Sequence, residues 1–172
     1  MKKDWTGNKA TAFAQQGVIY KTKQTNPDRG QDFYATSLKA LEDLLALEKF
    51  SNVWECADGA GHLCQVLKKY NILSRHSDLI YRGCGEGGVD FLKETKQWNG
   101  DIITNPPYRY AKEFVEKALE LVPEGRKVAF LLKIQFLESK SRMELFMKNP
   151  PKKIYVWCKG ITCALNGASA YS

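Results

Sequence analysis

The 172-residue sequence has no long hydrophobic run. No stretch approaches the roughly 20 consecutive apolar residues that a helix needs to cross a bilayer. The first residues, MKKDWTGNKATAF, also lack the apolar centre of a secretory signal peptide. These absences argue against a membrane protein and against a secreted one, so we expect a cytoplasmic protein that binds no membrane.

Paired metal-ligand motifs are also absent. The chain has five cysteines and two histidines, and no Cys-x-x-Cys pair occurs among them. Zinc sites and disulfide frameworks usually show regularly spaced pairs, and an odd number of cysteines does not fit a disulfide framework. A chain of this length can bury a core without such crosslinks. We therefore expect reduced, mostly buried thiols and no bound metal.

The net charge of +7 is concentrated at the two ends of the chain. Residues 1–31 carry six Lys or Arg and two Asp, whereas residues 139–172 carry six Lys or Arg and one Glu. Basic ends suit a polyanionic partner, because neutralising phosphates releases counterions. Solvated basic faces that only confer solubility explain the charge equally well.

Residues 1–31 are polar and lack sustained periodicity. We interpret them as a basic, flexible N-terminal arm, and residues 32–172 as a single domain. In that domain, apolar spacing predicts helices at residues 37–50, 62–70, 111–122 and 141–148. It predicts strands at residues 52–55, 73–79, 89–92, 101–104, 126–134 and 152–159. This alternation favours an α/β fold with a mostly parallel sheet flanked by helices. Such sheets bind ligands at the carboxyl ends of their strands.

The segment Asn105-Pro106-Pro107-Tyr108 directly follows one of these apolar strands. Two prolines can neither donate to a strand ladder nor continue a helix, so the strand must end in a stiff loop. An isolated Asn-Pro pair is typical of an ordinary turn. The segment gains functional meaning only together with other motifs.

A glycine turn, Glu55-Cys-Ala-Asp-Gly-Ala-Gly61, joins the first expected strand to a helix. Such a turn lets backbone amides approach an anionic group, although it often serves only close packing. The dinucleotide fingerprint Gly-x-Gly-x-x-Gly is not met, because Cys64 stands at its third glycine position. Asp78 ends the second expected strand, where a carboxylate can bind ribose hydroxyls or cap a turn.

In this order, the motifs DFYAT (residues 32–36), ECADGAG and NPPY resemble those of S-adenosylmethionine-dependent amino-methyltransferases. The chain most resembles the small phage and prophage DNA N6-adenine methyltransferases. The segments DWTGNKATAF and QDFYATSLKALEDLL share the resemblance, which spans nearly the whole chain. It implies a Rossmann-like methyltransferase fold. Two positions depart from the family pattern, since Cys56 replaces a frequent Pro and Asp58 a frequent Cys.

The resemblance implies a role for each motif residue in binding S-adenosylmethionine. Tyr34 and Thr36 would hold its methionine end, and Asp78 its ribose hydroxyls. Asp90 would accept from its adenine amino group, with Phe91 against the ring. The glycine turn would contribute Glu55, Ala57, Gly59 and Gly61, and the NPPY loop would contribute Asn105.

The same resemblance assigns the chemistry to Asn105, Pro106, Pro107 and Tyr108. The Asn105 side-chain oxygen and the Pro106 carbonyl would bind the two N–H groups of the target adenine and stabilise the charge developing on its nitrogen. Pro107 would keep the loop rigid. Tyr108 would stack on the target base, flipped out of double-stranded DNA. This reaction requires no metal.

Several alternatives stay open. The NPPY motif also occurs in RNA and protein-glutamine methyltransferases, and a catalytically inactive nucleic-acid-binding relative would keep the same motifs. Family members usually continue into a tryptophan-rich strand at the sheet edge, whereas this sequence ends at Ser172. We therefore expect that the last edge strand is missing from the sequence, or that another chain covers the exposed edge. The oligomeric state is not predicted.

Overall fold

The structure is a computed structural model that describes residues 38–157, 164–165 and 168–169. The expected arm at residues 1–31 and the candidate residues Tyr34 and Thr36 lie outside the described residues. Within the described part, no helix is both long enough and apolar enough to span a membrane.

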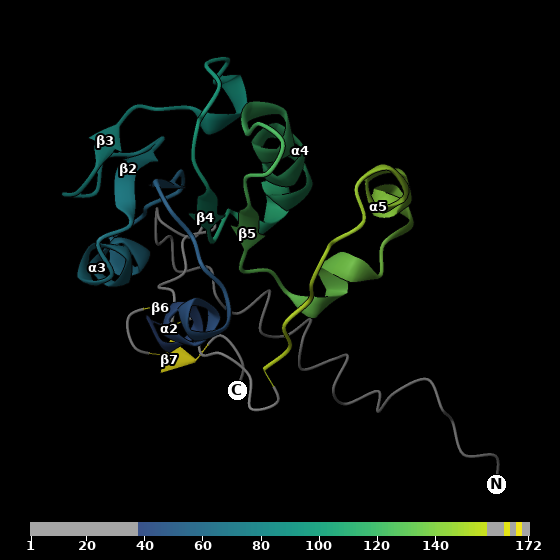
Figure 1. Ribbon diagram of the computed structural model, residues 1–172, viewed down its shortest axis with the longest axis horizontal. Helices are drawn as coiled ribbons and strands as arrows, with labels where there is room; N and C mark the ends of the chain where they lie inside the picture. Colours follow the sequence, from purple (N-terminus) through teal and green to yellow (C-terminus); the bar gives the residue numbers. More distant parts are fainter. Residues whose placement is uncertain (1–37, 158–163, 166–167, 170–172) are drawn as a thin grey trace, which may run out of the picture. The chain divides into compact units, whose positions relative to one another are not determined.

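A five-stranded, all-parallel sheet forms the centre of the fold (Figure 1). Its strands, in spatial order, are β3 (Glu86–Gly87), β2 (Leu73–Asp78), β1 (Val53–Glu55), β4 (Ile102–Thr104) and β5 (Val128–Phe130). The chain runs outward from β1 to β3, then returns to place β4 on the other side of β1. This reversal creates a topological switch point between β1 and β4, the usual ligand position in such sheets. The expected α/β fold with a mostly parallel sheet is confirmed.

Helices cover both faces of this sheet, and the alternation of side chains along each strand explains how. Val53 and Ile103 point to one face, where they pack against α2 (Leu38–Leu47) and α3 (His62–Lys69). Trp54 and Ile102 point to the other, where they pack against α4 (Ala111–Leu121) and η2 (Phe91–Lys93). Neighbouring residues thus supply two separate cores, because successive strand side chains point in opposite directions.

The remaining elements follow the loop after β4 or lie beyond β5. They are η3 (Tyr108–Tyr110), η4 (Ile134–Leu137), η5 (Lys140–Arg142), α5 (Met143–Lys148), β6 (Ala164–Leu165) and β7 (Ala168–Ser169). β6 and β7 pair antiparallel with each other, as a separate two-stranded sheet.

Three strand predictions need correction. Residues 89–92 are not a strand: the Asp90 carboxylate accepts from the Leu92 N–H at 3.2 Å and starts the 3-10 turn η2. The strand expected at residues 126–134 is only Val128–Phe130, because its partner β4 ends at Thr104, before the two prolines. Residues 152–157 form no strand; their side chains instead contact the end of α2 and the residue after it, with Tyr155 donating to Glu48 and Trp157 to Asp43.

The buried carboxylate of Asp101 joins three chain segments at the amino ends of the central strands. Its Oδ2 accepts from the Ser51 N–H at 2.7 Å, before β1, and its Oδ1 accepts from the Lys127 N–H at 2.8 Å, before β5. Its own carbonyl accepts from the Trp54 N–H at 2.9 Å. Asp101 therefore fixes where β1, β4 and β5 begin relative to one another.

The neighbouring Gly100 has no room for a side chain. A Cβ there would collide with the backbone oxygen of Asn52 and lie 2.7 Å from the Trp98 indole nitrogen. We expect Gly100→Ala to lower the free energy of unfolding by about 1–3 kcal/mol, because overpacking forces the backbone apart. Urea unfolding followed by tryptophan fluorescence measures this loss.

Gly125→Ala provides the control for that substitution. A Cβ at Gly125 meets nothing within 4 Å, although its φ of 87° makes any side chain there costly, by about 1 kcal/mol. A smaller loss in Gly100→Ala than in Gly125→Ala would show that the backbone around Asn52 yields easily.

Candidate functional site

Three of the expected site residues lie at, or directly after, the carboxyl ends of β1, β2 and β4. Glu55 is the last residue of β1, Asp78 the last of β2, and Asn105 follows β4 directly. Because these strands are parallel neighbours, the three residues lie at one edge of the sheet, beside the switch point. The sequence-predicted glycine turn and NPPY loop both start there.

The glycine turn adopts a backbone that only glycine adopts readily. Gly59 has φ 59° and Gly61 has φ 79°, both in the left-handed region, and Gly61 caps the start of α3. The Gly59 N–H donates to Asp78 Oδ2 at 2.8 Å, and the Ala57 N–H donates to Glu55 Oε1 at 2.9 Å. The two acidic residues therefore hold the turn in shape.

Asp78 is engaged through both of its carboxylate oxygens. Besides the Gly59 N–H on Oδ2, its Oδ1 accepts from the Ile80 N–H at 2.8 Å and pairs with the Arg82 guanidinium at 3.1 Å. Arg82 had not been singled out by the sequence. A ribose hydroxyl could donate to Oδ2 beside the Gly59 N–H, or to Oδ1 by sharing or replacing the Arg82 contact.

Glu55 is buried to 1% exposure, and its Oε2 has no hydrogen-bond partner among the described residues. The Thr104 hydroxyl, at the end of β4, is likewise buried and without a partner there. Burial raises the pKa of Glu55 to about 8, helped by the nearby carboxylates of Asp58 and Asp78 and offset only in part by the nearby Thr104 hydroxyl and Ala57 N–H. Glu55 is therefore mostly protonated at neutral pH.

The NPPY loop is a short, well-packed connection into α4. Pro106 is buried, and the Asn105 side-chain oxygen is buried as well. The Pro107 carbonyl accepts from the Tyr110 N–H at 2.9 Å and starts η3 with Tyr108. The Lys133 ammonium lies 4.7 Å from the centre of the Tyr108 ring, a cation–π contact that sequence reasoning missed.

Asp90 and Phe91 are placed differently from each other. Asp90 is part-exposed, caps η2 and pairs with Lys93 at 3.1 Å. Phe91 is 2% exposed and stacks on Phe114 with ring centroids 5.0 Å apart. It also meets Trp54 edge to face at 5.3 Å. Packing of the core explains Phe91 fully, so Asp90 is the stronger candidate of the two for ligand contact.

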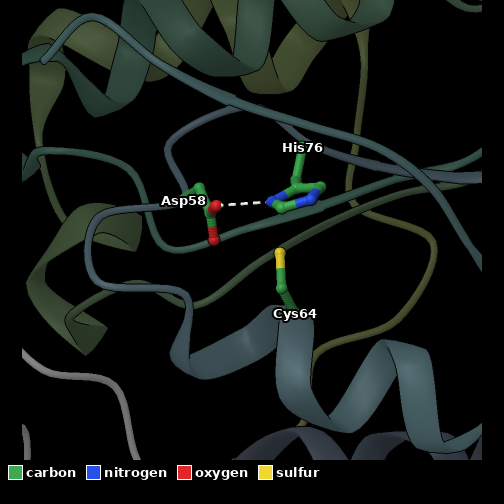
Figure 2. A group of neighbouring side chains, drawn as sticks. All are labelled: Asp58, Cys64 and His76. Atoms are coloured by element: carbon green, nitrogen blue, oxygen red, sulfur yellow. Dashed lines mark hydrogen bonds and ion pairs between the residues drawn. The ribbon is translucent and has the colours of Figure 1, made fainter. Parts of the chain in front are cut away.

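A cluster of Asp58, Cys64 and His76 lies beside the glycine turn (Figure 2). Sequence reasoning had not grouped them, because they come from the turn, from α3 and from β2. Local spacing such as Cys-x-x-Cys could not have revealed them, because the three residues lie far apart in the sequence and meet only in the fold.

The chain was also compared with known proteins. No protein-family model matches it, and no curated protein matches it either.

Proposed function

We propose that this protein is an S-adenosylmethionine-dependent methyltransferase that methylates the N6 amino group of adenine in DNA. The proposal combines the motif order of the sequence with the position of those motifs in the sheet. The glycine turn, Asp78 and the Asn105-Pro106-Pro107-Tyr108 loop all follow carboxyl ends of strands that meet at the switch point.

The observation that carries the proposal is the buried pair Glu55 Oε2 and Thr104 Oγ1: the two groups are close enough for the hydroxyl to lower the pKa of Glu55 in part, yet neither atom has a hydrogen bond of normal length among the described residues. They end β1 and β4, the two strands on either side of the switch point. Leaving a buried polar group without a hydrogen bond costs about 1–3 kcal/mol, so such groups usually have a function. A polar ligand bound at this edge of the sheet would satisfy both.

The residues present fit S-adenosylmethionine. The left-handed turn at Gly59 and Gly61 lets a ligand approach the backbone, and Asp78 and Asp90 offer carboxylate oxygens for hydroxyl and amino groups. When bound, the cofactor supplies an electrophilic methyl group. Because Glu55 is mostly protonated, its contribution to the negative charge near that cationic group is small at neutral pH.

We assign to the NPPY loop the role of binding the amino group of the target base. An exocyclic amine conjugated to a base is a weak nucleophile, since its lone pair is delocalised into the ring. The Asn105 side-chain oxygen and the Pro106 carbonyl accept its two N–H groups and orient the lone pair outward. As the nitrogen takes the methyl group, these fixed dipoles stabilise its positive charge, and a proton then leaves to solvent. Tyr108 provides the ring on which the flipped base stacks.

Transfer of labelled methyl groups tests the proposal. The purified chain is incubated with labelled S-adenosylmethionine and, in separate reactions, with double-stranded DNA, RNA and a glutamine-containing peptide. We expect label in DNA, at N6 of adenine after digestion to nucleosides. Label in RNA or peptide alone would assign the site to another substrate. No heat and no thermal shift on titration with S-adenosylmethionine would favour a catalytically inactive nucleic-acid-binding relative.

A second prediction concerns Asp78 and its partner Arg82. Asp78→Ala is expected to weaken cofactor binding by about 1–3 kcal/mol, because a charged acceptor and the clamp on the Gly59 N–H are both lost. Arg82→Gln should keep or increase the affinity, since it removes a competitor for Oδ1. Calorimetric titration with S-adenosylmethionine measures both.

Asp43→Ala on α2 is the matched carboxylate control and should bind as the wild type does. If Asp78→Ala binds equally well, Asp78 only shapes the turn. If Arg82→Gln binds much more weakly, Arg82 is itself a ligand contact and not a competitor.

A further inference from the structure

Three potential metal ligands from separate elements meet beside the glycine turn. Asp58 lies in the turn, Cys64 on α3 and His76 on β2, and their ligand atoms all lie within 4.8 Å of one another. Figure 2 shows the Cys64 sulfur facing the space beside the Asp58 carboxylate and the His76 ring. Asp58 Oδ2 and His76 Nδ1 are 2.7 Å apart.

The carboxylate of this cluster is buried and only half satisfied. Asp58 is 6% exposed, and its Oδ1 has no hydrogen-bond partner among the described residues. The Cys64 and Cys84 thiols lie near this carboxylate: burial and the Asp58 charge raise the pKa of both thiols. A thiol is only a weak hydrogen-bond donor, so it offsets little of the cost of removing water from a buried carboxylate oxygen. A cation held at Oδ1 would remove that cost.

Two glycines keep the space around the cluster free of side chains. A Cβ at Gly85 would lie 2.8 Å from Asp58 Oδ2 and 3.0 Å from His76 Nδ1. A Cβ at Gly61 would lie 2.9 Å from the Cys84 sulfur and 3.8 Å from Asp58 Oδ1. Cys84 therefore brings a second thiol to the rim of the same space.

We propose that Asp58, Cys64 and His76 bind one Zn²⁺ ion. The types of ligand atom in the cluster indicate which metal ion it would bind. Thiolate and imidazole ligands select zinc over magnesium or calcium, which prefer oxygen donors only, and zinc readily takes four such ligands in a tetrahedron.

Binding requires a modest rearrangement with a defined proton balance. The Cys64 thiol releases its proton to solvent. The His76 imidazole stays neutral and carries its single N–H on the ring nitrogen that does not bind the metal. The ion then connects the glycine turn to α3 and β2. This role is structural and does not depend on methyl transfer.

Titration with Co²⁺ tests the site in the full-length, reduced protein, because Co²⁺ replaces Zn²⁺ and gives thiolate charge-transfer bands in the near ultraviolet. We expect one Co²⁺ per chain, with bands that Zn²⁺ abolishes when added in equal amount. Cys64→Ser should remove most of the charge-transfer intensity, and His76→Gln should weaken Co²⁺ binding by at least about tenfold.

Two variants serve as matched controls. His62→Gln changes the other histidine of the chain, and Cys56→Ser changes a thiol that packs in the core on the opposite face of the sheet. Both should keep the wild-type stoichiometry and spectrum. Circular dichroism establishes which variants are folded.

The wild type provides a measurement that does not depend on the variants. Zn²⁺ should raise its unfolding temperature, and a strong chelator should reverse the rise. No stoichiometric Co²⁺ binding, or an unchanged thiolate spectrum in folded Cys64→Ser, would overturn the proposal.

Discussion

Asn105→Ala is expected to lower the rate of methyl transfer to adenine by about 10²–10³-fold, the loss seen when one preorganised dipole is removed from comparable sites. Affinity for S-adenosylmethionine should change little by comparison, because the side chain acts on the target amine. The residue follows β4 at the switch point, and its side-chain oxygen is buried. Single-turnover transfer of labelled methyl groups to DNA measures the rate, and calorimetry measures the affinity.

Substitutions of Tyr108 distinguish an effect on the chemical step from an effect on binding of the flipped base. Tyr108→Ala should weaken retention of the flipped base by about 1–3 kcal/mol, the value of one aromatic stacking contact. Tyr108→Phe keeps the ring, so we expect it to have only a small effect on retention of the base.

A wild-type rate of transfer in Asn105→Ala would contradict the role proposed for Asn105. The loop would then be an ordinary turn into α4.

The second large effect is the pH dependence that Glu55 imposes on stability. The pKa of its carboxyl is about 8 in the folded chain, because burial disfavours the charged form, against 4.5 for an ordinary Glu side chain. Between these values the folded state holds a proton that the unfolded state has released. Stability therefore falls as the pH rises from 4.5 to 8, with a slope that approaches about 1.4 kcal/mol per pH unit.

Glu55→Gln keeps the shape of the side chain and cannot ionise, so its unfolding free energy should lack this slope. The variant should be more stable than the wild type at pH 8, by an amount on the order of a few kcal/mol. Urea unfolding at intervals between pH 5 and 8 measures the difference. Parallel curves for the two proteins would show that Glu55 ionises normally.

Glu48→Gln is the matched control. Hydrogen bonds from Lys127, Lys153 and Tyr155 lower the pKa of Glu48 to about 2. Its contribution is therefore present above pH 4.5 and is lost as the pH falls toward 2. Between pH 5 and 8, this variant should keep the slope of the wild type.

The parts of the fold that the sequence predicted are those with local signals. The apolar residues Ile102 and Ile103, followed by two prolines, gave an inner strand with a defined end. The leucine stripe predicted a helix at residues 37–50, and α2 spans Leu38–Leu47, so it ends three residues earlier than predicted. Glycines at positions 59 and 61 gave a left-handed turn.

The errors arose where partners distant in the chain decide the outcome. Residues 126–134 have the composition of a long strand. However, β5 ends at Phe130, which pairs with Thr104, the last residue of its partner strand β4. The prediction that Phe91 contacts a ligand stays a prediction, while the ring contacts of Phe91 with Trp54 and Phe114 in the core had no local signal in the sequence. The contacts of Arg82 with Asp78 and of Lys133 with Tyr108 join loops whose approach no local pattern encodes.

The Asp101 carboxylate has a consequence for how this protein tolerates changes in its loops. It aligns the starts of β1, β4 and β5 through Ser51 and Lys127, at the end of the sheet opposite the glycine turn and the NPPY loop. Strand alignment is thus set by an anchor at the opposite end of the strands from these two loops. Changes in the length of either loop should therefore leave the alignment of the strands beneath them unchanged.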